Sequence, residues 1–320
     1  MQKNIIVSAP GSVMLMGEHA VVKGYWAIAC AVDKVIEVTL LPRNDRQVLI
    51  ESAVGNYRGS LDDLVTDTNL SFVLKAIELQ LAHLTCGFEL QIRAQFSHTL
   101  GLGSSAAVTV ATIKALTEYS AQALTDLEHL KLALAVVHAV QGRGSGTDLA
   151  ASIYGGVIAY QVSPCQVIKL AGTPALCLHY VGYKTKTPQV LAIVAKKERR
   201  QPALYAEIYR TMDSITQAAI KAFEQQNWPD LGELMNLYQG QMDSLGVNDL
   251  ALSEMIYRLR LQASEHSSTS KADNIKLHGV KISGSGLGDC VISLGDSVEL
   301  LGYQQIPISV STTGVVCHGS

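Results

Sequence analysis

Residues 100–107 read Leu100-Gly-Leu-Gly-Ser-Ser-Ala-Ala107, and small or apolar residues continue from there almost unbroken to Leu116. Gly101 and Gly103 permit backbone angles and close approaches that a Cβ atom would block. Ser104 and Ser105 follow, and serine is a favoured helix-capping residue. Because the next residues are apolar on nearly every side, they indicate a buried helix. The stretch therefore predicts a glycine-rich loop that leads into a core helix.

Such a loop predicts an anion site, because free N–H groups and the positive end of the helix dipole face whatever lies in front of the helix. Phosphate is the usual occupant of such a site. A tight turn before a core helix is the alternative interpretation. The loop is not a Walker A sequence, since no Lys-Ser/Thr pair follows its glycines, and Ala106 replaces the third glycine of a dinucleotide fingerprint.

The composition limits the classes of protein to consider. The chain has 320 residues, of which 17% are charged and 48% apolar, with a formal net charge of −3. This suits one large domain or two lobes and offers no basic surface for nucleic acid. No apolar run reaches the ~18 residues of a membrane-spanning helix. The six cysteines form no Cys-x-x-Cys pair. We expect a cytoplasmic protein with no nucleic-acid or membrane partner and no structural zinc.

Strand and helix patterns alternate irregularly along the chain, which favours an α+β fold over a doubly wound sheet. Short strands are expected on both sides of Ala9-Pro10-Gly11, and a long strand at 25–41. Thr125 to Glu128 is a capping box and predicts a helix that ends near Gly142. The strand patterns at 166–170 and 178–182 indicate the crossing into a second lobe. Helices dominate 187–263.

Three glycine-containing motifs are spread over nearly the whole chain. The first joins Ala9-Pro10-Gly11 to Gly17-Glu-His-Ala-Val-Val22, the second is Gly101 to Ala107, and the third is Ser283-Gly-Ser-Gly-Leu-Gly288. Each alone is weak, but their order and spacing together are specific. With Asp148 in Gly-Ser-Gly-Thr-Asp, the chain resembles the GHMP small-molecule kinases, and among them the mevalonate kinases.

The resemblance implies a two-lobed GHMP kinase fold. Residues 1–172 would form a ribosomal-protein-S5-like N-terminal lobe that binds ATP, and residues 173–320 a ferredoxin-like C-terminal lobe. It also implies ATP and Mg²⁺ as cofactors and a small-molecule substrate, mevalonate or a close relative, whose primary alcohol is phosphorylated. A homodimer is compatible with the sequence, which does not determine the oligomeric state.

The resemblance further implies a role for individual residues. Asp148 would be the catalytic aspartate and contact the substrate, although its spacing alone is equally typical of a helix N-cap. Ser105 would bind magnesium, and Glu18, His19 and Tyr154 would contact the substrate. The expected ATP contacts are Leu100, Gly101, Leu102, Gly103, Ser104, Ser105, Ala106, Gly284 and Gly286.

Two positions depart from the mevalonate kinase pattern. Ser12 stands where those enzymes carry a lysine, and Val137 where they carry a glutamate that helps to hold magnesium. The segment from Gln141 to Asp148 and the ending Gly288-Asp289-Cys290 of the third motif look more like those of phosphomevalonate kinases. A phosphomevalonate kinase, a GHMP-fold decarboxylase and a non-catalytic ligand-binding member therefore stay as alternatives.

The missing lysine raises the question of which cation balances the transferring phosphoryl group. Arg143 is one candidate, because it lies five residues before Asp148 in a glycine-flanked loop, and a solvated loop arginine is the alternative. A phosphorylated substrate would need further basic groups. The candidates for that purpose are Lys23, Arg143, Lys184 and Lys186.

Overall fold

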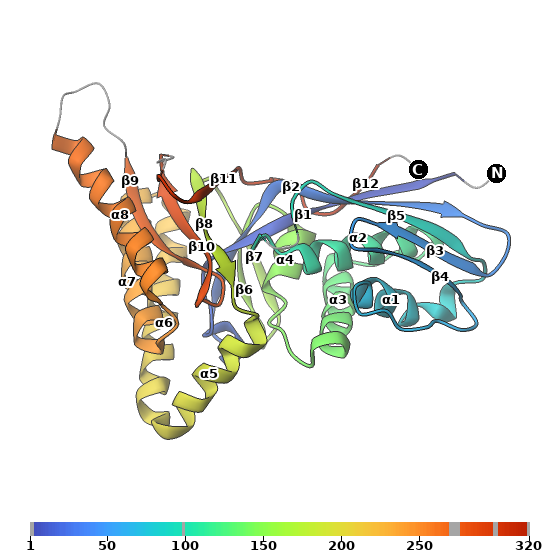
Figure 1. Cartoon of the computed structure of the whole chain (residues 1–320), viewed down its shortest axis with the longest axis horizontal. Coiled ribbons are helices and arrows are strands. Elements are labelled where there is room, and N and C mark those ends of the chain that lie inside the picture. The colour runs from blue at the N-terminus through green and yellow to red at the C-terminus, as the bar shows by residue number, and fades with distance from the viewer. Residues whose placement is uncertain (1–2, 98–99, 269–275, 297–299, 319–320) are drawn as a thin grey trace.

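The computed structural model describes residues 3–97, 100–268, 276–296 and 300–318, without the side chains of 262–268. Its described part contains two β-sheets, each with its own helices (Figure 1). The eight-stranded first sheet runs β12-β1-β2-β5-β3-β4, and β6 and β7 extend it from β2. Its strands are β1 (Ile5–Met16), β2 (Ala27–Pro42), β3 (Gln47–Ser52), β4 (Gly55–Ser60), β5 (Phe88–Ala94), β6 (Val157–Gln161), β7 (Gln166–Leu170) and β12 (Val316–His318).

Four helices belong to the first sheet, and α1, α2 and α3 lie along one face of its long strands in Figure 1. They are α1 (Ser71–Glu78), α2 (Ser104–Tyr119), α3 (Asp126–Gln141) and α4 (Thr147–Tyr154). The predicted capping box is present at α3, where the Thr125 side chain accepts from the Glu128 N–H and the Glu128 carboxylate accepts from the Thr125 N–H. The first lobe is therefore a sheet covered by helices.

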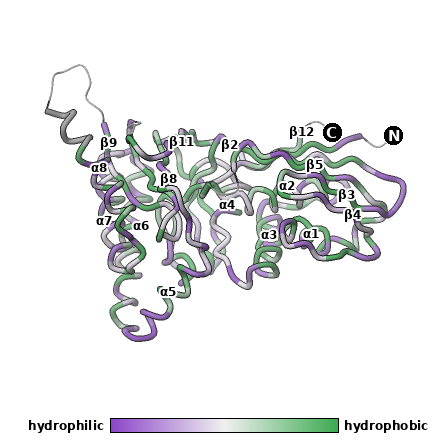
Figure 2. The backbone as a smooth tube through the Cα atoms, in the orientation of Figure 1, coloured by the Kyte–Doolittle hydropathy of each residue, from purple (hydrophilic) through white to green (hydrophobic). Residues whose placement is uncertain are grey.

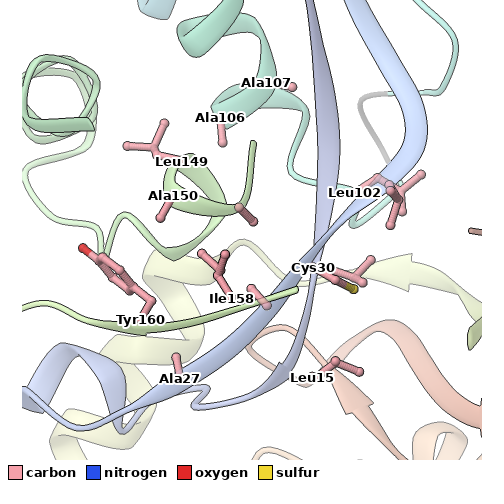
Figure 3. Packing of buried hydrophobic residues seen from close by; sticks show 14 of the residues in the cluster. Leu15, Ala27, Cys30, Leu102, Ala106, Ala107, Leu149, Ala150, Ile158 and Tyr160 are labelled. Carbon is pink, nitrogen blue, oxygen red and sulfur yellow. The ribbon is translucent and has the colours of Figure 1, made fainter. Parts of the chain in front are cut away.

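Close packing of small side chains brings α2 and α4 together. Figure 3 shows Ala106 of α2 above Leu149 and Ala150 of α4, with Ile158 of β6 below them. These side chains are at most 7% exposed. Since alanine allows two helix backbones to approach closely, the N-termini of α2 and α4 are held side by side against β1. This packing places the glycine-rich loop next to Asp148.

The second lobe consists of a four-stranded sheet, in the order β11-β8-β10-β9, and four helices. The strands are β8 (Leu176–Lys184), β9 (Leu277–Ser283), β10 (Gly288–Gly295) and β11 (Gln304–Ile308). The helices are α5 (Thr187–Arg200), α6 (Pro202–Glu224), α7 (Trp228–Leu245) and α8 (Leu250–Ser268). Hydrophilic residues gather where α5 meets α6 (Figure 2). Among the described helices, none is both long and apolar enough to cross a membrane.

The structure differs from the sequence-based expectations at two strands, β1 and β4. The two short strands predicted around Pro10 are one continuous strand, β1, whose pairing with β2 shifts register between Pro10 and Ser12. Strand β4 was not predicted, because its residues alternate polar and small side chains. Strands β7 and β8 belong to different sheets. The division at residues 172 and 173 stays a prediction, and β12 returns to the first sheet.

Candidate active site

The glycine-rich loop lies directly beneath Ser12 of β1. The Ser12 N–H donates to the Leu102 carbonyl at 3.0 Å, and the Leu102 side chain is fully buried. Gly103 adopts a left-handed conformation (φ 66°), and a Cβ atom there would come within 2.3 Å of the Ser12 hydroxyl oxygen. Only glycine satisfies both the backbone angle and this close approach. The sequence-based interpretation of Gly103 is confirmed in this respect.

Helix α2 begins without a side-chain cap. Gly103 is its N-cap residue, and neither Ser104 nor Ser105 makes a capping hydrogen bond. The expectation that these serines cap the helix is therefore wrong, because they already belong to its first turn. The N–H groups of that first turn keep their capacity to donate. The exposed Ser105 hydroxyl lies at the same helix end.

Asp148 lies in the first turn of α4, whose N-cap is Gly146 in a left-handed conformation (φ 80°). The N-cap interpretation of Asp148 is thus wrong. The Ser12 hydroxyl instead donates to Asp148 Oδ1 at 3.0 Å. Burial raises the pKa of Asp148, and the hydrogen bond from Ser12 and the positive charge of Lys184 lower it. Ser12 therefore connects the loop and the carboxylate.

A second carboxylate, Asp289, reaches this site from the other lobe. Its backbone is left-handed (φ 74°) at the start of β10. A Cβ atom on Gly101 would lie 2.5 Å from Asp289 Oδ1, so the carboxylate touches the glycine-rich loop. Lys184, at the end of β8, forms an ion pair with Asp289 Oδ2 at 2.7 Å. Asp289 Oδ1 is buried, and no described residue forms a hydrogen bond with it.

The first and third motifs meet through a buried ion pair. Lys281 Nζ of β9 lies 2.6 Å from Glu18 Oε1, and both side chains are at most 1% exposed. The Gly284 N–H donates to the same oxygen at 3.4 Å, and the Tyr238 hydroxyl donates to the Glu18 carbonyl at 2.9 Å. Burial raises the pKa of Glu18 and lowers that of Lys281, and their ion pair opposes both shifts. Glu18 thus joins the two lobes.

His19 makes a second contact between the same two motifs. Its Nε2 lies 2.9 Å from the Ser285 carbonyl oxygen, so this nitrogen carries the proton. Burial lowers the pKa of His19, which keeps the ring neutral, and Nδ1 is then an acceptor. His19 Nδ1 and Glu18 Oε2 are both buried and have no hydrogen-bond partner among the described residues. Each offers one acceptor atom that a ligand could use.

The remaining residues that the sequence predicted for the site lie in different parts of the structure. Gly284 and Gly286 form the turn between β9 and β10, both with left-handed backbones (φ 93° and 84°). Tyr154 is the last residue of α4, at the opposite end of the helix from Asp148. Arg143 is exposed and donates to the Pro188 carbonyl at 2.6 Å. The structure therefore places Lys184, and not Arg143, in contact with a carboxylate of the site.

Two residues of this arrangement, Lys281 and Asp289, were not among the site residues predicted from the sequence. Lys281 stands inside an apolar strand, and a lysine in such a strand needs a buried partner. That signal was available in the sequence, but it does not name the partner. Asp289 was quoted only as the end of the third motif. Its contact with Gly101 joins residues 188 positions apart and has no local sequence signal.

Comparisons with known proteins agree with this geometry. The model of the GHMP kinases N terminal domain matches residues 71–156 and that of the GHMP kinases C terminal matches residues 219–300. A galactokinase galactose-binding signature also matches residues 1–40. A mevalonate kinase of Methanothermobacter thermautotrophicus is 34% identical, over 89% of this chain and 88% of its own length. One from Pyrococcus horikoshii is 32% identical over 92% and 89%.

Solved structures show the same fold. The Methanococcus jannaschii mevalonate kinase superimposes with a TM-score of 0.77 at 25% identity, over 96% of this chain and 98% of its own. A Listeria innocua protein, Lin0012, reaches a TM-score of 0.83 at 22% identity, over 99% and 100%, which shows the fold alone. The chain therefore belongs to the GHMP kinase family, and the expected two-lobed α+β fold is confirmed. The curated relatives named above are mevalonate kinases.

Proposed function

We propose that the chain is an ATP-dependent mevalonate kinase, which converts mevalonate and ATP into 5-phosphomevalonate and ADP. One observation carries the proposal. Asp148 lies at the N-terminus of α4, joined through Ser12 to the loop before α2, in a chain 34% identical to a mevalonate kinase. A carboxylate near a phosphate-binding helix end is the arrangement that phosphoryl transfer to an alcohol requires.

The transfer itself needs little covalent help from the protein. An oxygen lone pair of the substrate's primary hydroxyl attacks the γ-phosphorus atom of ATP, and the bond from that phosphorus to the β–γ bridging oxygen breaks. The electron pair of the broken bond leaves with ADP, and the hydroxyl proton passes to the carboxylate of Asp148. Burial raises the pKa of Asp148, which makes this carboxylate a better proton acceptor than an exposed aspartate.

The remaining roles follow from the two glycine turns and the buried acceptors. The loop from Leu100 to Ala106 binds the phosphates of ATP through the first N–H groups of α2. Gly284 and Gly286 give the opposite turn the conformation to approach them. Glu18 and His19 bind the substrate through the two acceptors that have no partner in the described part of the chain. Tyr154 is assigned to the substrate through the family resemblance alone.

Magnesium fits this site as an ion held mainly by ATP. The described part of the chain contains no cluster of three or more side chains that could hold a metal by themselves. Mg²⁺ keeps several waters and binds phosphates with only one or two protein ligands. The exposed Ser105 hydroxyl, which does not cap α2, suits such a ligand. When bound, the ion would neutralise part of the phosphate charge.

A coupled assay of ADP release tests the proposed function. Purified protein is given MgATP with mevalonate, phosphomevalonate, diphosphomevalonate or galactose, and CO₂ is measured with the third. We expect turnover with mevalonate and little with the others. Galactose is included because of the signature at residues 1–40. Turnover with only phosphomevalonate, only galactose, or CO₂ release would replace the proposal, and ligand binding without any turnover would make the protein a non-catalytic member.

The proposed location of the enzyme is the cytoplasm. Its proposed partners are its small-molecule ligands and a second copy of the chain, with which it would form a homodimer. Cell fractionation tests the location. Sedimentation equilibrium of the purified protein tests the homodimer.

A further inference from the structure

The described part of the site holds two carboxylates and only one cation near them. Asp148 comes from the first lobe and Asp289 from the second, and both lie against the glycine-rich loop or its neighbour Ser12. Lys184 is the one described cation that pairs with either of them. A phosphate chain entering this site would meet two negative charges, so a cation is needed in addition to the helix dipole.

Three of the other basic side chains, Lys281, Lys23 and Arg143, have different partners. Lys281 is fully buried against Glu18, and its ring contact is with Tyr238 at 5.4 Å. Lys23 pairs with Glu198 at 2.6 Å, and Arg143 donates to the Pro188 carbonyl. Lys184 differs because its partner, Asp289, touches the glycine-rich loop, while the Lys184 side chain itself is 36% exposed. An ammonium group has three donors, and the ion pair with Asp289 engages one of them.

The fold holds Lys184 in place through two neighbouring strands. Lys184 lies opposite Gly288 in the antiparallel pairing of β8 with β10, and Asp289 follows Gly288 directly. The left-handed backbone of Asp289 turns its carboxylate toward Gly101. The lysine is therefore anchored by a carboxylate that itself touches the phosphate loop. This arrangement fixes a flexible side chain beside the helix end where phosphate is expected to bind.

We propose that Lys184 binds the γ-phosphate of ATP and balances the charge on the transferring phosphoryl group, and that Asp289 is a positioning residue for its ammonium group. The inference rests on the proposed use of ATP. It gives Lys184 the task that the resemblance assigns to a lysine at the position of Ser12. Ser12 is buried between Asp148 and Gly103, and its hydroxyl group carries no positive charge.

A comparison of two nucleotides tests this contact without any alcohol substrate. Dissociation constants of AMP-PNP and ADP, each with Mg²⁺, are measured by calorimetry for the wild type and for Lys184→Met. We expect the variant to bind AMP-PNP about 10-fold more weakly, because a charge-assisted contact is lost, and ADP unchanged. Lys114→Met is the matched control, since Lys114 forms a partly exposed 2.7 Å pair with Glu118 in α2. Equal affinities of Lys184→Met and wild type for AMP-PNP would overturn the inference.

Turnover separates a phosphate contact from simple neutralisation of Asp289. We expect Lys184→Met to lower kcat with mevalonate about 10²-fold, and Lys184→Arg to recover part of it. The double variant Lys184→Met/Asp289→Asn removes both charges. If Lys184 only neutralised Asp289, the double variant would regain wild-type kcat, and the inference would be wrong. If Lys184 binds phosphate, the double variant stays as slow as Lys184→Met.

The two proposals fail separately in these measurements. A wild type that does not phosphorylate mevalonate, but whose AMP-PNP affinity depends on Lys184, would overturn the proposed substrate and support the role of Lys184. A wild type that phosphorylates mevalonate, with Lys184→Met equally active, would do the reverse.

Discussion

Two ion pairs connect or face the junction of the lobes, and they differ in their surroundings more than in their geometry. Lys281 Nζ lies 2.6 Å from Glu18, and Lys184 Nζ lies 2.7 Å from Asp289. The side chains of the first pair are 0% and 1% exposed, and those of the second pair are 36% and 10% exposed. Each lysine comes from the second sheet, but only Lys184 retains access to solvent and to a ligand.

The comparison teaches that distance alone does not assign a role to a charged pair. In the pair of Glu18 and Lys281, the ammonium group donates to Glu18 Oε1 and to the Ile282 carbonyl, lies 5.4 Å from the Tyr238 ring centre and is fully buried, so a phosphate in solution cannot reach it. The net effect of this pair is to fix the first motif against the third. The pair of Lys184 and Asp289 is open on one side, which suits a group that must exchange partners during a reaction.

The largest expected effect concerns the open site. Asp148→Asn should retain AMP-PNP affinity and lower kcat with mevalonate by about 10²- to 10⁴-fold, because an amide cannot accept the hydroxyl proton. Steady-state kinetics and calorimetry on the same preparation measure both quantities. A variant that turns over at the wild-type rate would remove Asp148 from the reaction and leave its burial beside Ser12 as a structural feature.

The second prediction compares the two pairs directly through stability. Lys281→Met should lower the free energy of unfolding by about 3–5 kcal/mol, because it leaves a carboxylate buried without its counter-charge. Lys184→Met should cost about 1 kcal/mol or less, as a partly exposed pair does. Denaturant unfolding of the two variants measures the difference.

The double variant Glu18→Gln/Lys281→Met serves as the control for this comparison. Removing both charges should restore much of the lost stability, since no uncompensated charge remains. Equal losses in Lys281→Met and Lys184→Met would show that the closed pair is no more sensitive than the open one.

His129 is a buried ionisable group that forms no ion pair with a described residue, so the pH dependence of stability that it causes reflects its burial. His129 is 5% exposed and its Nε2 lies 3.1 Å from the Val110 carbonyl oxygen; burial lowers its pKa from 6.5 to about 4. Between these two pH values the His129 imidazole binds a proton in the unfolded chain but stays neutral in the folded chain. His129 therefore leaves the free energy of unfolding undiminished above pH 6.5 and lowers it as the pH falls toward 4. The loss is about 2 kcal/mol at pH 5.

The matched variant for this effect is His129→Gln, which has no proton to bind in this range. The wild type should lose about 2 kcal/mol more than the variant between pH 7.5 and pH 5, as measured by urea unfolding at both values. Parallel losses in the two proteins would assign the acid sensitivity to other groups.

The smallest expected effect is a displacement of the pH–rate profile. Asp148 must be ionised to accept a proton, so kcat declines on the acid side around its pKa. The Ser12 hydrogen bond lowers this pKa and Asp289 raises it. Ser12→Ala should therefore move the acid limb to higher pH, and Asp289→Asn to lower pH. Displacement of both variants in the same direction would contradict the described surroundings of Asp148.

Much of the fold was accessible from local patterns. The long strand at 25–41 and the capping box at Thr125 are both present. Strand β1 was predicted as two pieces, because Pro10 and Gly11 usually end a strand. The structure carries the strand through them with a register shift, and a Cβ atom on Gly11 would meet the Leu102 carbonyl at 2.7 Å. Tertiary contact with the phosphate loop thus overrides the local preference.

The sequence by itself determined the family, the glycine-rich loop before a buried helix and the aspartate at Asp148, because each depends on contiguous residues whose spacing carries the signal. Only the tertiary structure decided that Ser12 donates a hydrogen bond to Asp148, that Glu18 forms a buried ion pair with Lys281 and that Lys184 forms an ion pair with Asp289. These contacts join residues more than 100 positions apart. Their strength depends on burial and on the charges nearby, which no local pattern contains.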